Sequence, residues 1–136
     1  EISLGLVGSE MCIRDSFKNV LLIKKTKPAD QAGLFNGIGG KFEEFDIDAA
    51  ACVSREVKEE TGLDIPPDFW AEVGSYSDNE YYYVSILTSI VPFSTLSDAK
   101  SLTEEEVSII SMDKLDDVPF ANMAREMLEH CRKVYI

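Results

Sequence analysis

The sequence predicts an α/β fold of one domain, in which helices cover both faces of a β-sheet. The chain has 136 residues, 45% of them apolar, which is enough for one hydrophobic core and too little for a second. Short runs rich in β-branched and aromatic residues recur along it, bounded by Gly, Pro, Asn and Asp. Two longer segments place apolar residues at helical spacing, and strands mixed with two helices pack in layers.

Charge and cysteine content narrow the class of protein. The formal net charge of −12 argues against a surface for DNA or RNA, and no apolar run is long enough to span a membrane. Cys12, Cys52 and Cys131 form no C-x-x-C pair and predict reduced thiols in the cytoplasm. The single histidine, His130, cannot build a multi-histidine zinc site. We expect a cytoplasmic monomer or homodimer that binds a small molecule and neither a nucleic acid polymer nor a membrane.

The first sixteen residues, EISLGLVGSEMCIRDS, show no clear helical or strand period and lack the basic start and apolar core of a signal peptide. Read back through the genetic code, residues 6–16 resemble one frame of an adapter used in sequencing libraries. We interpret residues 1–16 as a non-native segment, and residues 17–136 as a domain whose native N-terminus is truncated. A genuine but unusual N-terminus is the open alternative. The assignment of elements therefore begins near Phe17.

The remaining elements are expected in the following order. Strands are expected over 20–25, 70–76, 81–91 and 107–112, and a short strand with a tight loop over 33–41. The turn Ser77–Glu80 joins the second and third of the longer strands, and residues 94–104 are expected to form a polar loop. One helix is expected over 49–61, with Asp48 as its N-cap and Gly62 as its C-cap. A closing helix is expected over 120–134.

The stretch that indicates chemistry is residues 55–63, REVKEETGL. On a helix, Glu56, Glu59 and Glu60 share one face and repel each other unless a cation lies among them. Mg²⁺ is a hard cation that carboxylates share with substrate phosphates, so this face is a candidate metal site. Arg55 lies four residues before Glu59 and can steady it. A solvated acidic helix face is the alternative interpretation of the same spacing.

Just upstream, residues 37–41 form a glycine-rich segment, GIGGK, that brings backbone and a lysine towards the start of the helix. Segments of this kind can approach phosphates closely. Together with the helix, this segment resembles the Nudix box: Gly, five residues, Glu, seven residues, then R-E-U-x-E-E-x-G-U, where U is a bulky aliphatic residue. Residues 55–63 match the second half, and Gly40 matches the first glycine.

The first half of the box departs from the pattern. Five residues separate Gly40 from the next motif position, which is Asp46 rather than Glu. Eight residues rather than seven separate Asp46 from Arg55. The role of the first acidic position is therefore open among the four acids of this segment, Glu43, Glu44, Asp46 and Asp48.

The resemblance implies an α/β/α sandwich with a mixed β-sheet and a hydrolase that cuts the diphosphate linkage of a nucleoside diphosphate derivative. It implies Mg²⁺, with Mn²⁺ as an alternative, at a metal site made of Glu56, Glu59, Glu60 and Gly40. The residues expected to act in catalysis are Glu59, Arg55 and Glu56. Candidates for an additional acid are Glu105 and Glu106, which a solvated acidic loop would explain equally well.

Substrate choice rests on a second likeness. Residues 35–41, FNGIGGK, are similar to the aromatic-Asn-Gly segment of Nudix enzymes that act on oxidised purine nucleoside triphosphates, and residues 115–120 to their late segment. This implies Phe35, Asn36 and Lys41 as substrate-binding residues; Asn36 making a turn before glycine is the alternative. The expected reaction converts a (deoxy)nucleoside triphosphate to the monophosphate and pyrophosphate. The alternatives are a nucleotide-sugar or dinucleotide pyrophosphatase and a non-catalytic nucleotide-binding module.

Overall fold

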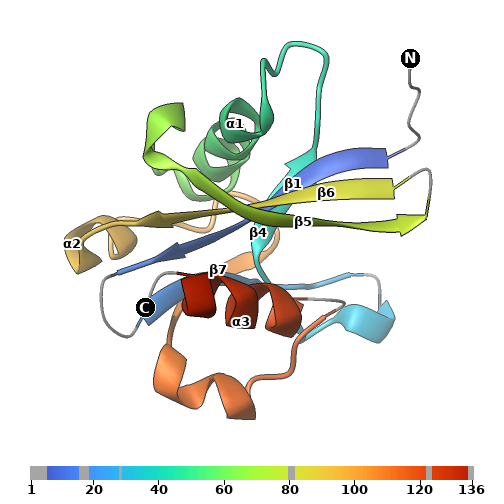
Figure 1. Ribbon diagram of the computed structural model, residues 1–136. Helices are drawn as coiled ribbons and strands as arrows, with labels where there is room; N and C mark the ends of the chain where they lie inside the picture. The colour runs from blue at the N-terminus through green and yellow to red at the C-terminus, as the bar shows by residue number, and fades with distance from the viewer. Residues whose placement is uncertain (1–5, 16–18, 28, 80–81, 122–123, 135–136) are drawn as a thin grey trace.

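The computed structural model describes residues 6–15, 19–27, 29–79, 82–121 and 124–134 (Figure 1). The strands are β1 (Leu6–Arg14), β2 (Asn19–Lys24), β3 (Phe35–Asn36), β4 (Ile38–Lys41), β5 (Ala71–Asn79), β6 (Tyr82–Ile90) and β7 (Glu106–Ser111). The α-helices are α1 (Ala49–Thr61), α2 (Phe93–Leu96) and α3 (Ala124–Val134). Short 3-10 turns cover Ala29–Gln31, Pro67–Phe69 and Met112–Asp117.

Strand β1 lies in the middle of a mixed sheet. It runs parallel to β6 along its whole length, and its other edge pairs antiparallel first with β4 and then with β2. β5 extends the sheet beyond β6, whereas β2 continues it to β3 and β7. The mixed sheet that the resemblance implied is confirmed.

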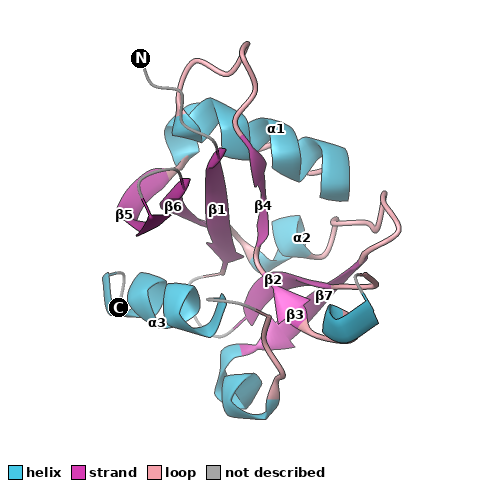
Figure 2. Cartoon of the chain, turned by 90° about the vertical axis from the view of Figure 1, so that its right-hand side faces the viewer, coloured by secondary structure: helices cyan, strands magenta, loops and turns pink. Residues whose placement is uncertain are grey.

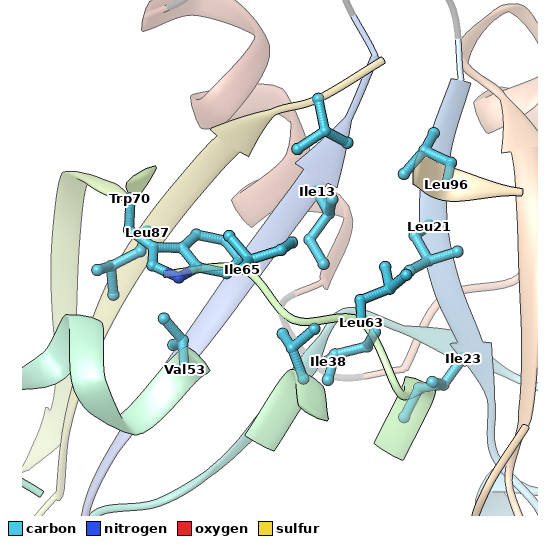
Figure 3. Close-up of a cluster of buried hydrophobic side chains, with 12 residues drawn as sticks. Ile13, Leu21, Ile23, Ile38, Val53, Leu63, Ile65, Trp70, Leu87 and Leu96 are labelled. Carbon is cyan, nitrogen blue, oxygen red and sulfur yellow. The ribbon is translucent and has the colours of Figure 1, made fainter. Parts of the chain in front are cut away.

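Two hydrophobic cores lie on opposite faces of this sheet, because successive side chains of a strand point to opposite faces. One core lies under α1 and the other under α3, and the two helices flank the sheet in Figure 2. The α1 core, shown in Figure 3, includes Ile13, Leu21, Val53, Val57 and Leu87. The α3 core includes Cys12, Leu22, Ile86, Met127 and Leu128. The α/β/α sandwich is therefore confirmed.

Most expected elements lie within one or two residues of their predicted bounds, and α1 matches at both ends. Three predictions were wrong. β5 continues through Asn79, where a turn was expected from residue 77, because those residues pair with β6; Glu80 and Tyr81 lie outside the described residues. The short helix α2 begins at Phe93, takes up the first residues of the expected polar loop, and buries Leu96.

The closing helix begins at Ala124 rather than at Phe120. Phe120 instead bridges to Phe35, whose N–H donates to the Pro119 carbonyl and whose carbonyl accepts from the Ala121 N–H, both at 2.8 Å. Extended pairing thus replaces the first helical turn. In the described ranges, no helix has the length and apolar character that a membrane crossing requires. Cys12 and Cys52 are buried thiols outside any disulfide, and the side chains of His130 and Cys131 lie outside the described residues.

The N-terminal segment, for which we saw no strand period, forms β1, with Cys12 and Ile13 buried in the two cores. Backbone pairing on both edges, rather than side-chain pattern, makes it a strand. Phe17, where the native domain was expected to begin, lies outside the described residues. The origin of residues 1–16 stays a prediction.

Candidate active site

A cleft of about 530 Å³ opens beside the acidic face of α1. The three glutamates of that face, Glu56, Glu59 and Glu60, all line it. The glycine segment lines the same cleft through Gly37 and Gly39. Two elements predicted to cooperate are thus brought together, because α1 packs against β4 and β1 (Figure 2).

Caps at both ends hold α1 in this place. The Asp48 carboxylate accepts a hydrogen bond from the Ala51 N–H at 2.9 Å, as an N-cap does. Gly62 ends the helix with φ of 79°, and its N–H donates to the Lys58 carbonyl at 3.0 Å. Both predicted caps are confirmed.

Backbone N–H groups of the segment before β7 donate hydrogen bonds to the last carbonyls of α1. The Lys100 N–H donates to the Thr61 carbonyl at 2.9 Å, and the Leu102 N–H donates to the Glu60 carbonyl at 3.2 Å. These are carbonyls that a helix end leaves without helical partners. The segment that follows, including Glu105, is therefore tied to the end of α1.

Arg55 joins the glycine segment to the acidic face. Its Nη1 donates to the carboxylates of Glu56, at 3.0 Å, and Glu59, at 3.3 Å. Its Nη2 donates to the Lys41 carbonyl at 3.1 Å. The predicted contact between Arg55 and Glu59 is confirmed. One guanidinium therefore places two of the three glutamates that α1 contributes to the cleft.

Asp46 is the acid of the loop that binds this arginine. The Arg55 Nε and Nη2 donate to its two carboxylate oxygens at 3.0 and 2.9 Å. The Glu43 N–H also donates to Asp46 at 2.8 Å, and the Asp46 N–H returns a bond to the Glu43 carbonyl at 3.0 Å. This turn accommodates the extra residue of the loop. Of the four candidate acids, Asp46 pairs with Arg55 and Asp48 caps α1.

The charges of this group are set by burial and pairing. Hydrogen bonds from Arg55 lower the pKa of the Asp46 carboxyl. Hydrogen bonding to Asp46 raises the pKa of Arg55, so the guanidinium stays charged. Burial raises the pKa of Glu56, an effect that the nearby charge of Arg55 opposes.

Gly40 lies against the Glu56 carboxyl group. A Cβ built on Gly40 would overlap the Glu56 carboxyl carbon and both of its oxygens. Gly40 is not among the residues that line the cleft. Its place in the motif is therefore explained by the close approach of a side chain that only glycine permits.

The donor set of the cleft fits a hard divalent cation, since all three helical side chains offer carboxylate oxygens. In the described part of the chain, no group of three or more His, Cys, Asp or Glu side chains is already converged as a metal site. Mg²⁺ needs no such group, because it is usually held by one or two carboxylates together with waters and substrate phosphates.

The other predicted binding residues are placed unequally. Asn36 lines the cleft at the end of β3, and its Oδ1 accepts the Gly37 N–H at 2.9 Å. Phe35 does not line the cleft and packs against the α3 core. Lys41 is exposed and also absent from the lining. Of the two candidate additional acids, Glu105 lines the cleft and Glu106 does not.

Lysines of the cleft were missed at the sequence level. Lys25 and Lys27 line it together with Ile23 and Thr103. In the strand predicted over 20–25, side chains alternate between the two faces, so Ile23 and Lys25 share one side. This alternation was the signal in the sequence that could have indicated Lys25. That this side faces the acidic helix emerges only from the packing of β2 against β1 and β7.

Comparison with known proteins agrees with this architecture. A family model described as the NUDIX domain matches residues 7–131. This match starts inside the N-terminal segment that we interpret as non-native. No curated protein matches the chain. A chain with this fold and a glutamate-lined cleft after a glycine segment belongs to the Nudix family. With its helical glutamates in place, it is classed as a Nudix hydrolase.

Solved structures share the fold at low sequence identity. The NUDIX domain of Shewanella oneidensis NrtR, complexed with ADP ribose, is similar with a TM-score of 0.83 and 16% identity, covering 99% of this chain and 91% of that one. A mutT/nudix family protein from Listeria innocua has a TM-score of 0.73 and 20% identity, with 98% and 95% covered. The MutT NUDIX hydrolase from Burkholderia pseudomallei has a TM-score of 0.70 and 18% identity, with 92% and 96% covered.

Proposed function

We propose that this protein is a Mg²⁺-dependent hydrolase of nucleoside triphosphates, which takes up one water and releases a nucleoside monophosphate and pyrophosphate. The observation that carries the proposal is that Glu56, Glu59 and Glu60 open onto one cleft beside the glycine segment. A cleft with this many carboxylates repels a polyphosphate unless cations lie between them.

The chain's own residues divide the work of this reaction. Glu56 and Glu59, steadied by Arg55, and the neighbouring Glu60 would hold the cation. A bound Mg²⁺ would neutralise charge on the phosphates and lower the pKa of a bound water. Glu59, whose side chain is 57% exposed, is our candidate for the carboxylate that accepts the proton of the attacking water.

Substrate recognition is proposed to involve the glycine segment. Gly37 and Gly39 let the backbone approach the phosphates, and Asn36 lies at the cleft wall with its amide nitrogen available to a base. Its Oδ1 is already engaged by the Gly37 N–H, so the amide orientation is set. We propose that Asn36 contacts the nucleobase and that Lys41 contacts a phosphate that extends beyond the cleft. Phe35 would act from the core behind Asn36.

The test is a screen of (deoxy)nucleoside triphosphates, nucleotide sugars and dinucleotides with Mg²⁺, in which the released phosphates are identified. Glu59→Gln keeps the size of the side chain and should reduce turnover by at least ~100-fold. Glu126→Gln, an exposed glutamate on α3, is the matched control and should keep turnover. Turnover that survives Glu59→Gln, or needs no divalent cation, would reject the metal assignment.

A second candidate substrate has one specific observation in its favour. The NUDIX domain of NrtR, similar to this chain over 99% of its length, was solved with ADP ribose, a nucleoside diphosphate joined to a sugar. Hydrolysis of such a linkage would release two monophosphates instead of pyrophosphate. The same screen distinguishes the two, because pyrophosphate appears only from a triphosphate. A non-catalytic module would bind nucleotides without any release of phosphate.

A further inference from the structure

The cleft also carries an ion pair that the proposed function leaves unused. Lys25 follows β2 and Glu105 precedes β7, and the Lys25 Nζ lies 3.7 Å from a Glu105 carboxylate oxygen. Both residues line the cleft. Only 18% of the Lys25 side chain and 20% of the Glu105 side chain are exposed. The two charges are therefore partly desolvated and feel each other more strongly than a surface pair does.

The register of the sheet makes these two residues neighbours. Lys24 pairs with Glu106 in the antiparallel ladder of β2 and β7, so Lys25 and Glu105 stand opposite each other one step further. Because side chains alternate, Lys25 faces the cleft while Lys24 lies over the Phe35 ring, 6.0 Å from its centroid. The same alternation keeps Glu106 out of the cleft.

The backbone of Lys25 is fixed on both sides. Its N–H donates to the Leu34 carbonyl, and its carbonyl accepts from the Gly33 N–H, each at 2.8 Å. Glu105 is fixed through its own N–H, which donates to the Thr103 hydroxyl at 3.2 Å. The backbone of both residues is therefore held in place independently of any ligand.

The contact itself is loose. A separation of 3.7 Å exceeds the ~2.7–2.9 Å of a good charge-assisted hydrogen bond. A neighbouring pair, Lys27 with Glu104, also lines the cleft, but its side chains are 71% and 63% exposed and solvent screens it. Lys25 is therefore the better-buried of the two ammonium groups that line the cleft in the described residues. A phosphate carries more charge and more acceptor oxygens than the Glu105 carboxylate.

We propose that Lys25 binds a substrate phosphate and that Glu105 occupies the place of this phosphate until the substrate arrives. Substrate binding then exchanges one ion pair for another and frees the Glu105 carboxylate inside the cleft. This inference rests on the proposed function. It makes Glu105 a competitor of the substrate in the free protein, so removing its charge strengthens binding of a diphosphate.

The experiment measures binding of imidodiphosphate, a diphosphate that resists hydrolysis, by calorimetry in the presence of Mg²⁺. Lys25→Met should weaken binding about tenfold, and Glu105→Gln should strengthen it about three- to tenfold. In the Lys25→Met background, Glu105→Gln should give a clearly smaller gain, because only the repulsion between the Glu105 charge and the ligand remains. Glu106→Gln removes the same charge one residue away, outside the cleft lining, and should stay within about twofold of the parent.

Binding to Glu105→Gln that is equal to or weaker than parental binding would overturn the exchange, as would a gain that is just as large without Lys25. Glu105→Asp, which withdraws the carboxylate by one methylene, should shift binding in the same direction and serves if Glu105→Gln does not fold. Nucleotide turnover of the parent protein distinguishes a failure of this inference from a failure of the proposed function. If the parent hydrolyses nucleotides while Glu105→Gln shows no gain in binding, only this inference is wrong. If the parent neither hydrolyses nucleotides nor binds imidodiphosphate, the proposed function is wrong as well.

Discussion

Asp46 and Arg55 are joined by two parallel hydrogen bonds, from Nε at 3.0 Å and from Nη2 at 2.9 Å, nine residues apart in the chain. The Asp46 side chain is 3% exposed and the Arg55 side chain 17% exposed. The loop before α1 is longer than the motif predicts and its acid is shorter, and the turn at Glu43 brings the two groups together. Through Arg55, this loop acid is connected to the carboxylates of the cleft.

Asp46→Asn should destabilise the protein by roughly 3 kcal/mol, because it removes one charge of a largely buried pair. The pKa of Asp46 is lowered in the fold, so its contribution is fully present above the pKa of an unfolded aspartate and is lost as pH falls through the folded value. Urea unfolding at several acidic pH values should therefore show a shallower loss of stability in the variant. If stability falls equally steeply at acidic pH in the variant and in the parent, the pair adds no stability.

Gly40→Ala should impair turnover by about 100-fold while leaving the unfolding midpoint nearly unchanged. The three atoms nearest to the added Cβ belong to the end of the Glu56 side chain, which can swing away at little cost to the fold. The displaced carboxylate then leaves its place beside Arg55. Steady-state kinetics and thermal unfolding measure the two effects. Full turnover in the variant would show that the position of Glu56 is not critical.

Ser54→Ala should cost about 1–3 kcal/mol of stability. The Ser54 hydroxyl accepts a hydrogen bond from the Trp70 indole at 2.8 Å and donates one to the Ile65 carbonyl at 2.6 Å. Without it, a buried indole N–H loses its partner. Trp70 is the single tryptophan, so its fluorescence reports both the altered contact and the unfolding transition. Ser75→Ala, at an exposed position of β5, is the control and should leave the transition in place.

We propose that residues 1–16 are foreign to the native protein and stand in for part of its first strand. β1 pairs on both edges of the sheet centre, so the native chain needs a strand at this position. The gene sequenced again from its source by a method without this adapter should agree from Phe17 onwards and differ before it. An identical N-terminal sequence would show that the segment is genuine.

The parts of the site that could be predicted are those that depend on residues close together in the sequence. The caps of α1 and the shared face of Glu56, Glu59 and Glu60 depend on neighbours within one or two helical turns, and local spacing reports them well. Asp46 remained one of four candidates, because the path of a loop is not encoded in helical or strand periodicity.

The longer-range features could not be predicted in the same way. β1 was missed because its strand character depends on β4 and β6, which pair with it from far along the chain. Lys25 was missed as a cleft residue because the strand pattern shows only that it shares a side with Ile23. Which side that is depends on how β2 and β7 pack in the sheet.

The sequence by itself determined a layered α/β domain and the acidic helix with both caps. These features follow from steric and hydrogen-bonding preferences that act over a few residues. Only the tertiary structure decided that Asp46 is the partner of Arg55, that Glu105 enters the cleft while Glu106 does not, and that Lys25 faces α1. The physical reason is that strand register and loop paths are set by pairing and burial between distant segments, which no local pattern encodes.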